Sequence, residues 1–165
     1  RAALGARLLS PAEVFADGDL SWPALDEARG RVIAVLDEGG EKRRQYAQRW
    51  RERAMFATLP AGEPGAAILI VNDPVAEFER IRSLVRAGYI VRTRADADTA
   101  EARRGDTARR DAAWASGAQL VSTDYYQPGG FPGTGYRVTV PGGGAGRCNP
   151  VRVEEPCRLG AAPQD

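Results

Sequence analysis

The residues best suited to chemistry follow two apolar segments in the second half of this 165-residue chain. Arg92 and Arg94 end one segment, and Asp96 and Asp98 come directly after them. Asp124 follows the next apolar segment. A guanidinium is planar and permanently charged, so these arginines would suit a phosphate group. A surface ion-pair cluster fits the same arginines and aspartates equally well.

Other polar residues near these segments have equally plain structural readings. Asp124 would also suit the cap of a following helix, and Tyr125 and Tyr126 would suit packing. A charged helix face in solvent is the simplest reading of four arginines, Arg103, Arg104, Arg109 and Arg110. The tripeptide Asn72-Asp73-Pro74 reads as a helix N-cap.

Histidine is absent from the chain, which removes the commonest general base, general acid and metal ligand. Lys and Arg total 23 against 22 Asp and Glu, and Lys42 is the one lysine. A net charge of +1 argues against binding to nucleic acid or to a membrane surface through bulk charge. No apolar run approaches the roughly 20 residues of a transmembrane helix.

The elements that would position these residues alternate between strand and helix patterns. Apolar runs predict strands at residues 31–36, 89–93 and 118–122, and helices follow at 41–50, 73–88 and 106–114. A further strand between the first two helices has two candidates, residues 53–58 and 66–71, and propensity favours the second. This alternation predicts a parallel α/β sheet, in which functional groups gather at the carboxyl ends of the strands.

Composition divides the chain into three regions. Residues 1–30 form a connecting segment with short helices that begin near Ser10-Pro11 and Ser21-Trp22. Residues 31–126 carry the α/β pattern. Residues 127–165 are a Gly- and Pro-rich tail with a short alternating strand at 136–140 and the two cysteines.

The two cysteines, Cys148 and Cys157, lie nine residues apart in this irregular tail. Without a CxxC motif or histidine, a zinc site is not expected. We expect a disulfide, which indicates a secreted or periplasmic protein, whereas two free thiols would suit a cytosolic one. The sequence shows no signal peptide.

Several segments together resemble one family. They are residues 22–30, residues 72–74, the Cys148-Asn149-Pro150-Val151 segment, and residues 88–126, which read GYIVRTRADADTAEARRGDTARRDAAWASGAQLVSTDYY. They resemble the carboxyl-terminal half of the calcium-dependent phosphoinositide phospholipase C family of bacteria and fungi, from about Leu9 to Cys157. More distantly, the last strand is similar to that of glycerophosphodiester phosphodiesterases.

The resemblance implies an α/β fold that is the C-terminal half of a TIM (β/α)8 barrel, with parallel strands five to eight and their flanking helices. A whole barrel needs about 250 residues. Strands five, seven and eight would be residues 31–36, 89–93 and 118–122. The family pattern selects residues 53–58 as strand six and leaves 66–71 in a loop. A half-barrel has unpaired edges, so we expect the missing N-terminal half as a partner.

The resemblance also implies a function: hydrolysis of a phosphoric diester of an inositol phospholipid, in lipid metabolism and with Ca²⁺. A histidine pair would serve as acid and base, and both the pair and the calcium ligands would belong to the N-terminal half. No catalytic residue or metal ligand is therefore expected in this chain, which alone would be inactive. Its expected substrate-binding residues are Arg92, Arg94, Asp124 and Tyr126.

Transient contact with a membrane surface would accompany such a substrate. Two alternatives remain at this point. One is specificity for glycerophosphodiesters on the same scaffold. The other is a non-catalytic domain that binds a sugar phosphate through its arginines.

Overall fold

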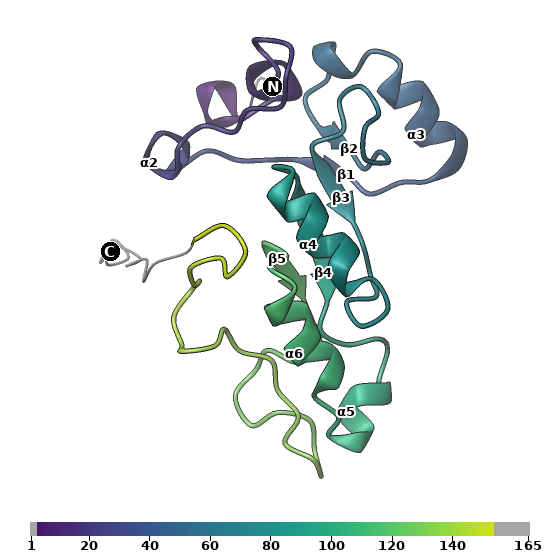
Figure 1. Cartoon of the computed structure of the whole chain (residues 1–165), viewed down its shortest axis with the longest axis vertical. Helices are drawn as coiled ribbons and strands as arrows, with labels where there is room; N and C mark the ends of the chain where they lie inside the picture. The colour runs from purple at the N-terminus through teal and green to yellow at the C-terminus, as the bar shows by residue number, and fades with distance from the viewer. Residues whose placement is uncertain (1–2, 154–165) are drawn as a thin grey trace. The chain divides into compact units, whose positions relative to one another are not determined.

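The computed structural model describes residues 3–153, which form two compact units that meet between Leu69 and Ile70. Helices and strands alternate along both units, and the paired strands β1–β2 and β4–β5 run parallel (Figure 1). The predicted α/β class with parallel strands is therefore confirmed. Within residues 3–153, none of the helices has the length and apolar character that crossing a bilayer requires.

The first unit holds two short parallel strands and several short helices. Its elements are η1 (Gly5–Arg7), α1 (Pro11–Val14), α2 (Leu25–Ala28), β1 (Val35–Leu36), α3 (Gly40–Ala47), η2 (Trp50–Glu52) and β2 (Phe56–Ala57). Val35 lies opposite Phe56 and Leu36 opposite Ala57. The predicted strand at 31–36 is thus much shorter than expected, and Val35 is 37% exposed.

Local signals in the sequence explain how α1 begins and what it packs against. Ser10 donates hydrogen bonds from its backbone N–H and its hydroxyl to the Glu13 carboxylate, both at 2.8 Å. This capping box satisfies a free donor at the start of the helix. Phe15, which follows α1, packs edge-to-face on Trp50 with 4.8 Å between ring centroids.

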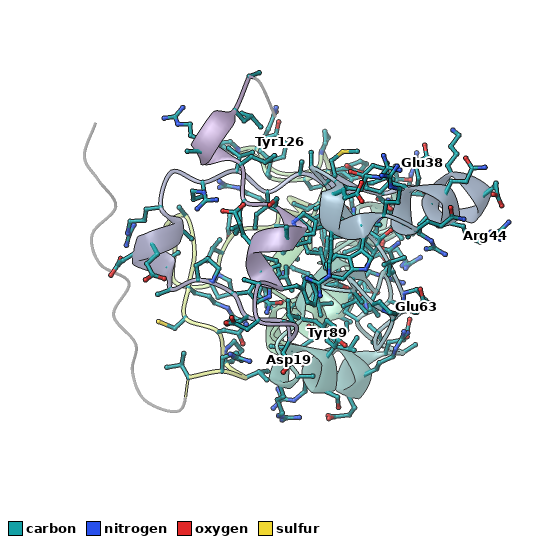
Figure 2. The ribbon with its side chains drawn as sticks, turned by 90° about the horizontal axis from the view of Figure 1, so that it is seen from above. Asp19, Glu38, Arg44, Glu63, Tyr89 and Tyr126 are labelled. Carbon is teal, nitrogen blue, oxygen red and sulfur yellow. The ribbon has the colours of Figure 1, made fainter. Side chains whose placement is uncertain are left out.

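Helix α3 carries charge on nearly every turn and has no buried residue. Arg44 pairs with Glu41, and Lys42 lies 3.6 Å from Glu38. In Figure 2, Glu38, which precedes α3, and Arg44, which belongs to it, are labelled, and the side chains of the helix extend away from the ribbon. The predicted charged helix over 41–50 is confirmed for residues 41–47 and ends before Trp50.

A three-stranded sheet in the order β3-β4-β5 positions the polar residues of the second unit. Its elements are β3 (Ile68–Ile70), α4 (Phe78–Arg86), β4 (Ile90–Arg94), α5 (Ala100–Arg104), α6 (Ala108–Ala115) and β5 (Leu120–Ser122). The register of β4 and β5 sets Arg92, Thr93 and Arg94 opposite Leu120, Val121 and Ser122. The boundary between the two units falls inside β3.

Helix α4 confirms the apolar pattern of the helix predicted over 73–88, but it begins later, at Phe78. Asp73 accepts hydrogen bonds from the backbone N–H groups of Val75 and Ala76 at 3.1 and 3.2 Å, just before the helix. A buried apolar face made of Ile81, Leu84 and Val85 packs toward the sheet. The prediction that the asparagine-aspartate-proline segment is the helix N-cap is wrong, because the N-cap of α4 is Glu77 and Asp73 instead caps the turn that precedes the helix.

Two expectations about strands are wrong. Residues 66–71, which the family pattern places in a loop, contain strand β3, because the apolar run Ile68–Ile70 is buried in the sheet beside β4. Residues 136–140 do not form a strand. Tyr136 and Val138 are buried while Arg137 and Thr139 are exposed, but the backbone N–H of Val138 bonds to the loop carbonyl of Tyr125 instead of to a strand.

Candidate functional site

A polar hollow of about 110 Å³ lies at the carboxyl ends of β4 and β5. It is lined by Arg92, Arg94, Asp96, Asp98, Ser122, Thr123 and Asp124. The structure thus brings together three of the four predicted substrate-binding residues, Arg92, Arg94 and Asp124. This placement follows from the parallel register, which puts the ends of the two strands side by side.

The alternation of β4 sends its two arginines to the same side of the strand. Val91 and Thr93 are fully buried, so the intervening side chains of Arg92 and Arg94 face outward. Arg92 donates from a guanidinium nitrogen to Asn72 Oδ1 at 2.9 Å. Within residues 3–153, no hydrogen bond or ion pair holds the guanidinium of Arg94. The hollow therefore offers one oriented and one unengaged cation.

Asp96 is a structural member of this cluster. It is 4% exposed, and it accepts hydrogen bonds from the hydroxyl of Thr123 at 2.5 Å and from the backbone N–H of Asp124 at 3.2 Å. The Thr123 hydroxyl in turn accepts the N–H of Tyr125 at 2.9 Å. Asp96 therefore ties the loop after β4 to the loop after β5, and each of its carboxylate oxygens already accepts one hydrogen bond.

Asp98 is the only non-glycine residue of 3–153 with a positive φ, at 53°. Its carbonyl accepts a hydrogen bond from the Tyr125 hydroxyl at 3.0 Å. Burial, and next the negative charge of Asp96, raise the pKa of Tyr125, so this hydroxyl stays a donor at neutral pH. The Tyr125 hydroxyl thus helps to hold the positive φ of Asp98, and the Asp98 side chain lines the hollow.

Tyr126 does not line the hollow. Its side chain is 64% exposed, and its backbone carbonyl accepts a hydrogen bond from Arg137 at 3.3 Å (Figure 2, where Tyr126 is labelled). The neighbouring Tyr125 instead packs edge-to-face on Tyr136, with 5.5 Å between ring centroids. The role of Tyr126 in substrate binding stays a prediction.

Two further charged residues, Glu101 and Arg109, form an ion pair that holds the loops beside the hollow. Their carboxylate and guanidinium meet at 3.0 Å, with side chains only 9% and 22% exposed. Burial acts to raise the pKa of Glu101, but hydrogen bonds from the backbone and the charge of Arg109 outweigh it and lower the pKa. Glu101 is therefore ionised at neutral pH and forms a partly buried ion pair.

Sequence reasoning missed this support. It assigned Arg109 to a solvated helix face, yet Arg109 donates to the carbonyl of Asn72 at 3.0 Å and lies 3.7 Å from the Asp73 carboxylate. The solvated-face reading is wrong for Arg109 and for Arg110, which is half-buried and donates to the Arg137 carbonyl at 3.1 Å, and it holds for the exposed Arg103 and Arg104. The one available signal was the position of Asn72 directly after an apolar segment, where functional residues collect.

The chemistry of the hollow is that of recognition. Two guanidiniums can bind a phosphate, and the carboxylates of Asp98 and Asp124 can accept hydrogen bonds from hydroxyl groups. The chain has no histidine, the side chain that most often serves as a general base. A polyol phosphate combines the two kinds of group that this lining would bind.

These residues do not fit a calcium ion. Among residues 3–153, no three His, Cys, Asp or Glu side chains are grouped so that they could hold a metal. Asp96 already accepts two hydrogen bonds, and two arginines share the same hollow. Calcium needs six to eight oxygen ligands.

The predicted disulfide involves Cys148, which is half-buried, and Cys157, which lies outside the described residues. The Cys148–Cys157 bridge stays a prediction.

Comparison with protein-family models gives a match over residues 14–150. The matching family is described as phosphoinositide phospholipase C, Ca²⁺-dependent. Comparisons with curated proteins and with solved structures give no match.

Proposed function

The chain belongs to the Ca²⁺-dependent phosphoinositide phospholipase C family, and we propose that it forms the substrate-binding side of an enzyme that cleaves inositol phosphodiesters. The family indicates a phospholipase C-like activity on phosphoinositides. One observation supports the proposal that this chain binds the substrate. Arg92, Arg94, Asp98 and Asp124 line the same hollow.

Recognition in this proposal divides between the two kinds of charge. Arg92 and Arg94 bind the phosphate, whose negative charge grows as an inositol hydroxyl attacks the phosphorus. Asp98 and Asp124 accept hydrogen bonds from ring hydroxyls and set which face of the ring is presented. The Asp96 to Thr123 bond holds the two loops at the spacing that this requires.

The acid and base are proposed to come from a histidine pair outside this sequence. Proton transfer to the leaving oxygen needs a group that titrates near neutrality, and the chain contains no histidine. Strand β5 ends the order β3-β4-β5, which is compatible with strands one to four of a barrel pairing with its edge. On this proposal β1, β2, β4 and β5 are barrel strands five to eight, β3 is an additional strand, and the chain alone is inactive.

Calcium enters as an expectation from the family alone. The described residues offer no set of oxygen ligands for it, so its ligands are proposed to lie with the histidines. Secretion or export to the periplasm is likewise proposed, on the basis of the cysteine pair. A transient contact with a lipid surface follows from the proposed substrate, an inositol phospholipid.

A direct assay of the full-length protein tests the proposed function. Vesicles of phosphatidylinositol in phosphatidylcholine are incubated with the protein, with calcium or with a chelator, and the water-soluble products are identified. We expect inositol phosphate, cyclic or open, and its loss in the chelator. Release of glycerol phosphate instead would favour the glycerophosphodiester alternative, which the family match does not support. Binding of inositol phosphate without any hydrolysis would indicate a non-catalytic domain.

A further inference from the structure

Asn72 connects the hollow to the Glu101–Arg109 ion pair, through its side chain on one side and its backbone carbonyl on the other. Its Oδ1 accepts the hydrogen bond from the Arg92 guanidinium at 2.9 Å. Asn72 belongs to the loop after β3, twenty residues before Arg92 on the neighbouring strand. The backbone of Arg92 is also held at this point, because its carbonyl accepts a hydrogen bond from the N–H of Val71 at 2.9 Å.

Arg109 in turn holds the loop that carries Asn72. Its guanidinium donates to the Asn72 carbonyl at 3.0 Å and approaches the Asp73 carboxylate at 3.7 Å. Asp73 also accepts hydrogen bonds from the backbone of Val75 and Ala76, so the loop is bonded to the turn that leads into α4. Moving the Asn72 backbone would therefore require breaking the charge-assisted hydrogen bond from Arg109, and rotating its side chain would break the one from Arg92.

Glu101 completes the chain of contacts and joins it to the other side of the hollow. One carboxylate oxygen accepts from Arg109 at 3.0 Å, and the other accepts the backbone N–H of Ala97 at 2.9 Å. Ala97 lies between Asp96 and Asp98, two lining residues. One buried carboxylate thus supports both the loop after β3 and the loop after β4.

We infer that Asn72, held in place by the Arg109–Glu101 ion pair, is the positioning residue that orients the Arg92 guanidinium toward a phosphate in the hollow. The inference deepens the proposed function, and rests on it where phosphate is concerned. Arg92 would otherwise lose several rotamers on binding a ligand, and a pre-formed hydrogen bond reduces that entropic loss. Arg94, which has no such support, is the natural comparison within the same strand.

A double-mutant cycle in the full-length protein tests this inference. The variants are Asn72→Ala, Arg92→Ala and the combination, and the measurements are kcat and KM on phosphatidylinositol vesicles and the Kd of myo-inositol 1-phosphate by calorimetry. We expect Asn72→Ala to weaken binding by about fivefold to tenfold alone and by less than about twofold in the Arg92→Ala background. The kinetic loss should appear in the same parameter, kcat or KM, as the loss caused by Arg92→Ala.

Gln127→Ala is the matched control, since it removes an exposed side-chain amide from a loop outside the hollow. It should change neither the binding nor the kinetics. Equal losses from Asn72→Ala in both backgrounds would show a general structural role and would overturn the inference.

A spectroscopic measurement separates this inference from the proposed activity. With ¹⁵N-labelled protein and no ligand, hindered rotation about the Nε–Cζ bond of Arg92 should give resolved guanidinium signals, which Asn72→Ala should average. Averaging together with an absence of phosphodiesterase activity would leave the positioning role standing and refute the proposed function. Identical Arg92 signals in both proteins would refute the positioning role even if the enzyme is active.

Discussion

At the scale of single residues, the two arginines of β4 do not have equal surroundings. Arg92 is half-buried and bonded to Asn72, whereas Arg94 is exposed and unengaged among residues 3–153. A phosphate that binds both must immobilise Arg94 anew, while Arg92 is already ordered. Arg92 should therefore contribute more to the binding of a phosphate than Arg94.

Replacement of Arg92 tests its place in the site. In the full-length enzyme we expect Arg92→Ala to lower turnover at least about tenfold, because a charge-assisted contact to the reacting phosphate is lost. Initial rates on phosphatidylinositol vesicles provide the measurement. Arg104→Ala is the control, as its side chain on α5 is 64% exposed and outside the hollow. Unchanged kinetics in Arg92→Ala would remove this residue from the site.

Tyr136 supports the loops around the hollow from the core. It is 3% exposed and donates its hydroxyl proton to the Ala95 carbonyl at 3.0 Å. Burial, and next the charge of Asp96, raise its pKa from 10.0 to about 12. The folded protein holds this proton more tightly than the unfolded chain, so the stabilisation is complete below pH 10.0 and is lost as the pH rises through about 12.

This linkage gives two measurable outcomes for Tyr136. Absorbance titration of the phenols should show one tyrosine ionising near pH 12, and Tyr136→Phe should abolish that step. The same variant should lower the free energy of unfolding by about 1–2 kcal/mol at pH 7, because the buried Ala95 carbonyl loses its donor. Tyr126→Phe, at an exposed position, should change neither quantity. A wild-type titration with every phenol near pH 10.0 would contradict the prediction.

At the residue scale, the sequence could predict the positions of side chains where strand geometry alone determines them. The strand-end rule placed Arg92, Arg94 and Asp124 at one hollow. This rule could not predict the contact between Asn72 and Arg92, because the contact depends on the conformation of a loop and not on the alternation of side chains along a strand. It could not decide between adjacent tyrosines either, and Tyr125 turned out to be the one that packs inward.

At the scale of elements, the turns after β5 are shaped by close backbone approach. Gly129 and Gly130 both have positive φ, at 93° and 65°. A Cβ at Gly130 would lie 2.4 Å from the carbonyl oxygen of Gly135, whereas one at Gly129 would meet nothing within 4 Å. The turn at Gly130 is thus also part of the packing of the tail.

Alanine substitutions at these two glycines form a matched pair. Both introduce a side chain at positive φ, which destabilises by about 1 kcal/mol. Gly130→Ala should lower the free energy of unfolding by about a further 1–3 kcal/mol, because backbone atoms must move apart. Urea denaturation of the two variants gives the comparison. Equal losses at the two positions would show that the approach to Gly135 is not tight in solution.

The periodic elements were the easier part of the fold to predict. The helix of the second unit with buried Ile81, Leu84 and Val85 followed from its apolar spacing, and so did β4 from its alternation. Helix α5 was not foreseen, since five residues rich in Ala and Arg carry too little period to distinguish from a loop. Propensity predicts strand β3 correctly, whereas the family pattern places the same residues in a loop.

At the scale of the whole molecule, the sheets are small for the apolar surface that the strands carry. One sheet has two strands and the other has three. Leu120 on β5 is 50% exposed, and Val32, Ile33 and Val35 around β1 are 40%, 39% and 37% exposed. Strand edges and apolar faces of this kind favour pairing with further polypeptide.

The behaviour of the isolated chain follows from these open strands. When residues 1–165 are produced alone, we expect self-association, binding of a hydrophobic dye and a broad thermal transition, with no hydrolysis of phosphatidylinositol. Light scattering, dye fluorescence and calorimetry provide the measurements. A monodisperse monomer with a sharp cooperative transition would contradict the half-barrel proposal.

The two outward arginines of β4 have a consequence for how its strand pairs during folding. Val91 and Thr93 are fully enclosed, and Arg92 and Arg94 alternate with them. Sliding β4 by one residue against β5 would drive both guanidiniums into the interior, at a desolvation penalty of several kcal/mol for each ion. The two charges that would bind a ligand therefore also raise the free energy of the shifted strand register. Replacement of both arginines by apolar residues should therefore weaken the preference for the native β4–β5 register as well as the affinity for a ligand.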